Sequence, residues 1–235
     1  MVQKKNEFGQ PIGESVPAWT PRRLPDVDEL AGRYCRLERL SVARHGTGLS
    51  NCFVDQSTPD QWTYLGYGPF ESHQAFVGWL AGQERIQDPR FFAVWVTGDP
   101  APSGLISLLR IDQHMGSIEI GHVHFGRELR RTRAATEAVF LLIKHVFDNL
   151  GYRRCEWKCD SLNQASRRAA ERLGFQFEGV FREDRVYKGR NRDTAWYSLI
   201  DKQWPEVKQQ IQLWLLPENF DEQGMQFKSL RIPCD

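Results

Sequence analysis

The chain has 235 residues, a length that favours one large domain or one domain with appended segments. Hydrophobic residues make up 40% of the sequence, which is enough to build a buried core. The formal net charge at pH 7 is +1, so the chain is not a general polyanion binder and any anion site has to be local. We therefore expect no nucleic-acid partner.

Targeting, redox and metal signals are few. No apolar run is long enough to cross a membrane, and residues 1–7 lack the apolar core of a signal peptide. The five cysteines form no Cys-x-x-Cys pair, and no histidine cluster at metal-ligand spacing accompanies them, so we expect no metal. These features favour a cytoplasmic protein with free thiols and no membrane partner. The cysteines are Cys35, Cys52, Cys155, Cys159 and Cys234.

The first half of the chain predicts an arm, a strand and two helices. Residues 1–31 are polar and rich in proline and glycine, which indicates an extended arm. Alternating apolar and charged side chains predict a strand over residues 34–40, and Ser41 suits the N-cap of a helix toward residue 54. The aromatic, glycine-rich residues 61–70 predict a loop, and residues 72–86 have the spacing of an amphipathic helix.

The second half of the chain alternates strands with helices. The predicted strands cover residues 91–97, 105–111, 117–125, 153–159, 175–181 and 194–200, the last two joined by a hairpin connection at residues 187–193. The predicted helices cover residues 134–150, 162–173 and 204–216. This order predicts an α/β (α+β) domain over residues 32–201, built on a sheet of mixed direction, followed by a C-terminal helix and tail over residues 202–235.

The helix predicted over residues 134–150 is the longest in the chain and is apolar around most of its circumference. Only Glu137, Lys144 and Asp148 form a narrow polar stripe, so we expect the helix to be sandwiched between other elements. A basic loop leads into its start, where N–H groups of the first turn have no partner within the helix and the helix dipole is positive. A strand that feeds such a loop is typical of a phosphate site.

A second cluster follows, with Asn163-x-x-Ser166, then Leu-Gly-Phe over residues 173–175 and Glu-Gly over residues 178–179. Together with the basic loop and its Ala-Ala-Thr-Glu-Ala run, it resembles the GNAT superfamily of N-acyltransferases over residues 32–201. The closest likeness is to the RimJ/RimL-like branch, which includes enzymes that acetylate ribosomal-protein N-termini. The resemblance implies the GNAT fold, a mixed central sheet flanked by helices with a splayed central strand.

The resemblance also implies acetyl-CoA as the donor, direct transfer of acetyl to an amine acceptor, and a monomer or homodimer. Arg130 matches the first position of the family's phosphate loop and Ala135 the last, but Arg133 replaces a glycine. Asn163 matches the asparagine along the pantetheine arm. The implied acetyl-CoA contacts are Val123, His124, Phe125, Arg130, Arg131, Thr132, Arg133, Ala134, Ala135, Thr136, Asn163 and Ser166.

The chemistry of the transfer needs three groups. The leaving thiolate needs a hydrogen-bond donor, and the family's usual tyrosine is Ala170 here, so Ser166 is the candidate. The developing oxyanion needs an N–H group, expected where the central strand bulges near residues 121–124. The acceptor amine has to lose a proton, and the candidate bases are Glu119, His122 and His124. Strand alternation puts Glu119 on the face opposite the histidines unless a bulge intervenes.

Each of these assignments has a plainer alternative. Asn163 and Ser166 suit the first turn of a helix and could act as caps. Trp62, Tyr64 and Tyr67 could line an acceptor pocket or fill the edge of the core. The sequence therefore supports an acetyl-CoA-dependent N-acetyltransferase, with a non-catalytic acyl-CoA-binding or interaction module as the alternative. The missing loop glycine and the missing tyrosine are what favour that alternative.

Overall fold

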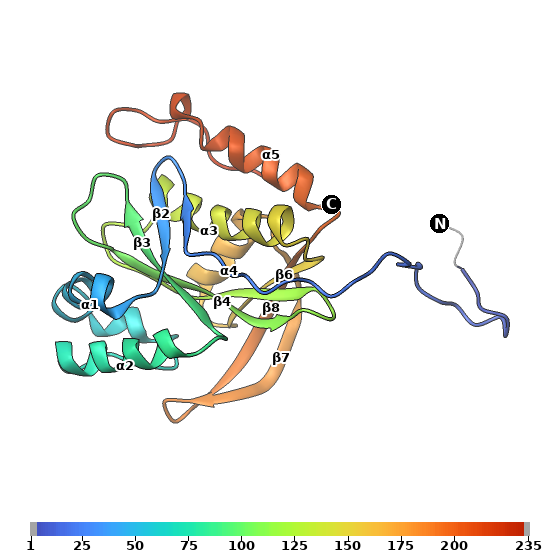
Figure 1. Ribbon diagram of the computed structural model, residues 1–235, viewed down its shortest axis with the longest axis horizontal. Helices are drawn as coiled ribbons and strands as arrows, with labels where there is room; N and C mark the ends of the chain where they lie inside the picture. The colour runs from blue at the N-terminus through green and yellow to red at the C-terminus, as the bar shows by residue number, and fades with distance from the viewer. Residues whose placement is uncertain (1–3, 233–235) are drawn as a thin grey trace.

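The computed structural model describes residues 4–232. One eight-stranded sheet runs through the body in the order β1-β2-β3-β4-β5-β6-β8-β7 (Figure 1). Every neighbouring pair of described strands is antiparallel except β5 with β6, so the predicted mixed sheet is confirmed. The strands are β1 Glu29–Ala31, β2 Cys35–Arg39, β3 Arg90–Val96, β4 Gly104–Asp112, β5 Ser117–Phe125, β6 Arg154–Asp160, β7 Gln176–Tyr187 and β8 Arg190–Ile200.

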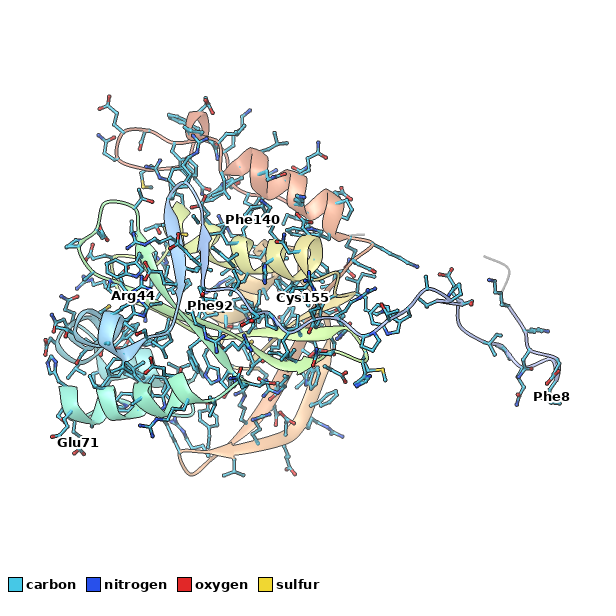
Figure 2. The ribbon with its side chains drawn as sticks, viewed as in Figure 1. Phe8, Arg44, Glu71, Phe92, Phe140 and Cys155 are labelled. Carbon is cyan, nitrogen blue, oxygen red and sulfur yellow. The ribbon has the colours of Figure 1, made fainter. Side chains whose placement is uncertain are left out.

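Helices cover both faces of the sheet, and each face has its own core. The helices α1 and α2 lie on one face, over a core that includes Phe53, Trp62 and Phe91. The helices α3, α4 and α5 lie on the other face, over the larger core, whose members Phe140 and Cys155 lie within the body in Figure 2. The bounds are α1 Val42–Ser50, α2 His73–Arg85, α3 Arg133–Lys144, α4 Gln164–Arg172 and α5 Trp204–Trp214.

The central helix α3 is sandwiched between the sheet and α5, as its apolar circumference predicts. The ring centres of Phe140 and Phe147 lie 5.9 Å and 5.4 Å from that of Trp204, at the start of α5. The regular helix is shorter than predicted, because it changes at Lys144 into a π-helical turn over His145–Asn149. The polar stripe is also less exposed than expected, since Glu137 is only 5% exposed.

Glu137 connects α3 to the turn between β1 and β2. Its carboxylate accepts hydrogen bonds from the backbone N–H groups of Arg33 (2.9 Å), Tyr34 (2.6 Å) and Cys35 (2.9 Å). Gly32 stands against the same carboxylate, because a Cβ added there would lie 2.8 Å from Glu137 Oε1. The buried charge is therefore satisfied by main-chain donors, at the cost of requiring a glycine beside it.

Several secondary-structure elements differ from the sequence expectations. The hairpin strands β7 and β8 are longer than predicted, so the two residues Lys188 and Gly189 form the turn in place of residues 187–193. The charged side chains at this end of the hairpin stay exposed, so backbone hydrogen bonds between β7 and β8, and not burial of side chains, extend the two strands. The first helix ends at Ser50 and continues as a π-helical turn, Asn51–Asp55. The short strand β1 was not expected, because it has no apolar alternation to reveal it.

The N-terminal arm extends away from the body (Figure 1), and contacts of Trp19, Arg22 and Arg23 anchor its later part. The indole N–H of Trp19 donates to the carbonyl of His114 (2.7 Å), in the turn between β4 and β5. Phe8, further out on the arm, is 78% exposed and lies at its far end in Figure 2. Among the described helices, none is both long and apolar enough to span a membrane. Four cysteines are free thiols, and Cys234 lies outside the described residues.

Candidate active site

The sheet opens between its two parallel strands. Residues 117–120 of β5 pair with residues 154–157 of β6, and no ladder pair joins the later residues of the two strands within the described chain. Both strands nevertheless continue, β5 to Phe125 and β6 to Asp160. The two strands therefore diverge beyond Ile120 and Trp157, and this gap in the hydrogen-bonded ladder is the splayed strand that the resemblance implied.

The other edge of β5 carries the expected bulge. Gly121 pairs with Ser107 and His124 with Leu105, so β5 has one residue more than β4 between these pairs. His122 occupies that stretch with a φ of +49°, in the left-handed region that a non-glycine residue rarely adopts. The bulge was predicted at residues 121–124, and such outliers persist only where the surrounding structure holds them.

The bulge brings the three candidate bases to the same face of the sheet. Ile118 and Ile120 pack in the α3 core, so Glu119 between them points to the face of α1 and α2. His122 and His124 also face α1 and α2, because their rings contact the core on that side. Plain alternation would have separated Glu119 from the histidines, and the extra residue in β5 removes that separation.

The two histidines are neutral at neutral pH. Burial lowers the pKa of His122 to about 4 and that of His124 to about 3, with Arg110 and Arg130 adding repulsion. The ring of His124 is wedged between Phe53 and Trp62, with 4.2 Å between centroids on each side, so it is chiefly a packing residue. No group of three or more His, Cys, Asp or Glu within residues 4–232 could hold a metal ion.

His122 is more accessible than His124, and one of its ring nitrogens is held in place. Its Nδ1 lies 3.2 Å from the hydroxyl of Tyr67, and the two rings stack with centroids 5.6 Å apart. Nε2 makes no hydrogen bond within residues 4–232 and is left for another partner. This residue is therefore the better placed of the two histidines to take a proton.

Glu119 is buried between two cations. Its Oε2 lies 2.6 Å from Arg110 Nη1 and 3.1 Å from Lys158 Nζ, and the residue is 3% exposed. Burial raises the pKa of Glu119 above its usual range, while Arg110 and Lys158 oppose that shift. Lys158 also pairs with Glu156 at 2.7 Å, so a chain of alternating charges crosses the sheet at this level.

The start of α3 has the unpaired donors of an anion site. Thr132 is the N-cap, and its Oγ1 accepts the N–H of Ala135 at 3.1 Å. The backbone N–H groups of Arg131, Arg133 and Ala134 have no partner among the described residues. Arg131 has a φ of +61°, which bends the loop into the helix. Free N–H groups clustered at a positive helix end fit the oxygens of a diphosphate.

The arginine in place of the loop glycine fits without backbone strain. Arg133 is the first helical residue and has no positive φ, so its position does not need a glycine for conformational reasons. Its guanidinium lies 4.3 Å from the ring centre of Tyr34 and 5.1 Å from that of Phe220. These rings hold the side chain. The guanidinium charge therefore lies between the loop and the C-terminal tail, and its contact with a phosphate stays a prediction.

Arg130 ties the loop to the other side of the gap. Its Nε donates to the carbonyl of Phe125 at 2.8 Å, and its Nη2 donates to Gln61 Oε1 at 3.0 Å. The family position that Arg130 matches thus braces the end of β5 against the loop before α2. Val123 and Phe125 are both implied as cofactor contacts. They lie on the stretch of β5 that makes no ladder pair with β6, and they pack toward the α3 core.

Asn163 and Ser166 lie at the start of α4, on the α3 side of the gap. Asn163 is the N-cap and its Oδ1 accepts the N–H of Ser166 at 3.1 Å, so the capping alternative is correct for this residue. Its amide nitrogen makes no hydrogen bond within residues 4–232 and can serve a ligand. Ser166 Oγ accepts the indole N–H of Trp157 at 2.9 Å, so the hydroxyl proton is available to donate, and the neighbouring Cys159 thiol is one acceptor for it.

Aromatic residues of the loop after α1 enclose the gap on the opposite face. Trp62 is 1% exposed and fills the edge of the core, so it supports this wall from behind. Tyr67 contacts His122, and the hydroxyl of Tyr64 donates to the carbonyl of Leu162 at 3.3 Å. Lys188, at the turn of the β7–β8 hairpin, donates to the carbonyl of Trp62 at 2.7 Å. Trp157 and Lys188 are positioned by long-range contacts, which no local sequence pattern reveals.

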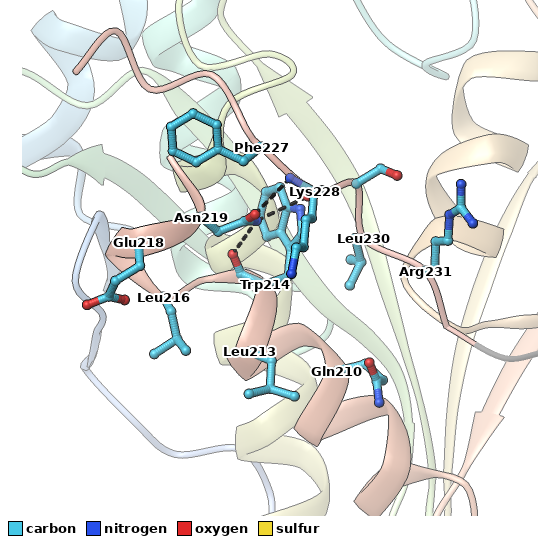
Figure 3. Close-up of a pocket in the computed structure, with 11 residues that line it drawn as sticks. Gln210, Leu213, Trp214, Leu216, Glu218, Asn219, Phe227, Lys228, Leu230 and Arg231 are labelled. Carbon is cyan, nitrogen blue, oxygen red and sulfur yellow. Dashed lines mark hydrogen bonds between the residues drawn. The ribbon is translucent and has the colours of Figure 1, made fainter. Parts of the chain in front are cut away.

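A cavity of about 470 Å³ lies away from the gap, between α5 and the C-terminal tail. Figure 3 shows Trp214 at its centre, with Phe227 and Lys228 from the tail along one side. Asn219 holds the tail in place by donating to the carbonyls of Trp214 (3.0 Å) and Lys228 (3.1 Å). None of the candidate catalytic residues lines this cavity.

Solved structures of acetyltransferases share this fold. A crystal structure of a GCN5-related N-acetyltransferase from Brucella melitensis is 46% identical, with a TM-score of 0.89, over 92% of this chain and 97% of that one. A GNAT-family structure from Chromobacterium violaceum is 43% identical, with a TM-score of 0.77, over 83% of this chain and 99% of that one.

Sequence relatives extend over a shorter stretch. A Bacillus subtilis protein provisionally named ribosomal N-acetyltransferase YdaF is 32% identical over 110 residues, 47% of this chain. The match spans 60% of that relative's own length, which is less than two thirds. The family described as the acetyltransferase (GNAT) domain matches residues 51–176, more than half of the chain. With the open sheet, the helix-start loop and these matches in agreement, the chain belongs to the GNAT acetyltransferase family.

Proposed function

We propose that this protein is an acetyl-CoA-dependent N-acetyltransferase in which the acceptor amine attacks the acetyl group directly. The gap between β5 and β6 is the observation that carries the proposal. On the α3 side it is bordered by a helix start with free N–H groups and by α4, and on the other side by His122 and Glu119. Donor and acceptor can therefore approach one acetyl group from opposite faces of the sheet.

The residues on the α3 side suit the donor. Bound acetyl-CoA would supply an activated acetyl thioester. Within residues 131–136, the free N–H groups of Arg131, Arg133 and Ala134 would hold its pyrophosphate. The amide nitrogen of Asn163 would bind along its pantetheine arm. The hydroxyl of Ser166 would donate to the sulfur, because Trp157 already occupies one of the acceptor positions on its oxygen. Backbone N–H groups at the bulge would stabilise negative charge on the carbonyl oxygen.

The amine has to be deprotonated before it attacks, and two groups on the acceptor side suit this role. Glu119, working through a water, is the first, because burial raises the pKa of its carboxyl. His122 is the second, through Nε2, and it is the weaker base because burial lowers its pKa to about 4. We place the reaction in the cytoplasm, where scattered free cysteines stay reduced. A protein N-terminus and a small-molecule amine both remain acceptable acceptors, and an α-amine, with a pKa of about 8, is the easier to deprotonate.

The base is tested with Glu119→Gln and His122→Asn, the second chosen because asparagine tolerates the left-handed backbone at that position. If Glu119 is the base, Glu119→Gln should lower turnover most below the pKa of the acceptor, and alkaline pH should partly restore it. If His122 is the base, His122→Asn should show that behaviour. Wild-type pH–rate profiles in both variants would contradict a side-chain base on β5.

The overall proposal is tested by release of free thiol from acetyl-CoA with a panel of peptides and small amines. Amine-dependent thiol release, with acetylated product found by mass spectrometry, is the expected result. The alternative is a non-catalytic acyl-CoA-binding module. Two departures from the family pattern favour it: Ala170 replaces the usual tyrosine, and the loop glycine is missing. Tight CoA binding with no thiol release in the presence of any amine would favour that alternative.

A further inference from the structure

A second, smaller cavity lies beside the gap, on the sheet face that also carries Glu119. It measures about 120 Å³. Since a water molecule occupies about 30 Å³ in the liquid, the space suits one small polar group on a short stem. The residues that line it are Arg110, Lys158, Asp184, Arg185, Arg192, Thr194 and Trp196.

The lining is dominated by cations, and two of these face each other. Arg185 and Arg192 are direct partners in the β7–β8 ladder. Like charges directly opposite each other destabilise a pair of strands. Asp184 pairs with Arg185, since its Oδ2 lies 3.4 Å from Arg185 Nε, and it also accepts the hydroxyl of Thr194 at 2.7 Å. Arg192 forms no ion pair within residues 4–232, so a positive charge remains uncompensated.

Two of the residues that line this cavity each carry a buried donor without a partner. Arg192 Nε and the indole Nε1 of Trp196 have no hydrogen-bond partner among the described residues. Leaving a buried donor unpaired costs about 1–3 kcal/mol, so such groups call for an acceptor from outside the chain. Lys158 Nζ lies 3.7 Å from the ring centre of Trp196, which fixes the ammonium at the edge of the same space. The cavity thus offers donors and positive charge together.

The cavity adjoins the place where transfer would occur. Trp157 is the last residue of β6 that pairs with β5, and Lys158 follows it at the start of the gap. Arg110 and Lys158, which line the cavity, are also the two ion-pair partners of Glu119. A group bound here would therefore contact the same two cations as the proposed proton acceptor.

We propose that this cavity binds a carboxylate or phosphate group of the amine-bearing acceptor, so that the enzyme selects acceptors that are anionic close to the reacting amine. The inference rests on the proposed function and specifies its substrate class. Arg185 and Arg192 hold the anion, and Trp196 donates a further hydrogen bond to it. The acceptor then has its anion on the two arginines and its ammonium group toward the Glu119 carboxylate, so each charge of the acceptor meets an opposite charge on the protein.

The test compares acceptors that differ only in the anion. Phosphoethanolamine is paired with ethanolamine, and a peptide that begins Ala-Asp is paired with one that begins Ala-Asn. Thiol release should show a KM at least ten-fold lower for the anionic member of one pair, and that pair identifies the anion as phosphate or carboxylate. Equal KM values within both pairs would overturn the inference and leave the acetyltransferase proposal intact.

Variants then locate the effect. Arg192→Gln and, independently, Arg185→Gln should raise KM for the preferred anionic acceptor by ten-fold or more and leave its neutral counterpart unchanged. Arg192→Lys should retain part of the preference. Arg182→Gln removes the same charge from β7 at a position that does not line the cavity, and should have no effect. A loss of preference in Arg182→Gln as large as in Arg192→Gln would overturn the assignment, because it would reflect net charge alone.

A binding measurement separates the two proposals. Calorimetry with inorganic phosphate, at saturating CoA so that the α3 loop is occupied, should detect binding to the wild type and to Arg182→Gln. Binding should be lost in Arg192→Gln. If phosphate binding is lost only in Arg192→Gln but no amine causes thiol release, the result would support the anion cavity and contradict the acetyltransferase proposal. Phosphate binding unchanged in Arg192→Gln and Arg185→Gln would overturn the cavity assignment.

Discussion

At the scale of single residues, the site depends on which proton each hydroxyl and ring nitrogen has free. Ser166 receives a hydrogen bond from Trp157 and can donate its own proton, either to the Cys159 thiol or to a ligand. His122 has one nitrogen held by Tyr67 and the other unengaged. A sequence shows the residue type but not which of its atoms is occupied. Ser166 could therefore be named from the resemblance, whereas its donor Trp157, nine positions earlier on β6, could not.

Ser166→Ala should lower turnover by roughly ten-fold and leave acetyl-CoA affinity within a few-fold. The reason is that one hydrogen bond to the leaving sulfur acts only while the thioester breaks, and a weak donor should contribute less than a full oxyanion contact. Steady-state kinetics and calorimetry measure the two quantities. Gln164→Ala, an exposed neighbour in α4, is the control. Unchanged turnover in Ser166→Ala would reduce the serine to a partner of Trp157.

The buried histidines should make stability depend on pH. Their pKa values in the folded state, about 4 and about 3, lie below the ordinary 6.5. Between pH 6.5 and pH 4 the unfolded chain binds protons that the folded chain does not, so stability is present above pH 6.5 and decreases as the pH falls. Urea unfolding at pH 7 and pH 5 should show a loss of about 2 kcal/mol per histidine.

His124→Phe tests this directly, since it keeps a ring between Phe53 and Trp62 but removes the titrating nitrogen. The decrease in unfolding free energy from pH 7 to pH 5 should shrink by about 2 kcal/mol in the variant. The same decrease in both proteins would show that His124 is protonated in the folded state or exposed to water.

At the scale of elements, the long apolar helix and the basic loop before it were predictable because each depends on local sequence. The hydrophobic pattern of residues 134–150 gave the helix, and Thr132 with the alanines after it marks the start. The bulge in β5 was predicted only through the resemblance. Its consequence for Glu119 and the histidines depends on the φ of one residue, His122, and no periodicity shows that value.

Ala135→Asp should weaken acetyl-CoA binding by ten-fold or more. The substitution adds a negative charge and bulk to the first turn of α3, where the free N–H groups face the proposed pyrophosphate. Calorimetry measures the affinity. Gln74→Asp adds the same negative charge in the first turn of α2 and should have no effect. Equal affinities for wild type and Ala135→Asp would place the pyrophosphate elsewhere.

At the scale of the whole molecule, the sheet separates a donor side from an acceptor side, and the gap is their connection. Sequence could predict the mixed sheet, since a strand–helix–strand unit followed by a hairpin implies one parallel pair. It could not predict the ion pairs that cross the sheet. Arg110, Glu119 and Lys158 come from three different strands, and only the strand order brings them together. The small cationic cavity was missed for the same reason.

Glu137→Ala should destabilise the protein by about 3 kcal/mol or more, because it leaves three main-chain N–H groups at the β1–β2 turn without an acceptor. Urea unfolding at pH 7 measures the loss. Glu137→Gln keeps one oxygen acceptor and should cost less. Glu71→Ala, at an exposed position visible at the surface in Figure 2, should change stability by no more than about 0.5 kcal/mol. A similar small change in Glu137→Ala would contradict this role.

The close approach of Gly32 to Glu137 also restricts how this sequence can change over generations. A side chain gained at residue 32 collides with the carboxylate, and a carboxylate lost at residue 137 leaves the turn without acceptors. Either step alone is costly, so the two positions should be inherited as a pair. Descendants that depart from glycine and glutamate should do so at both positions together, and a double replacement should cost less than the two single losses added.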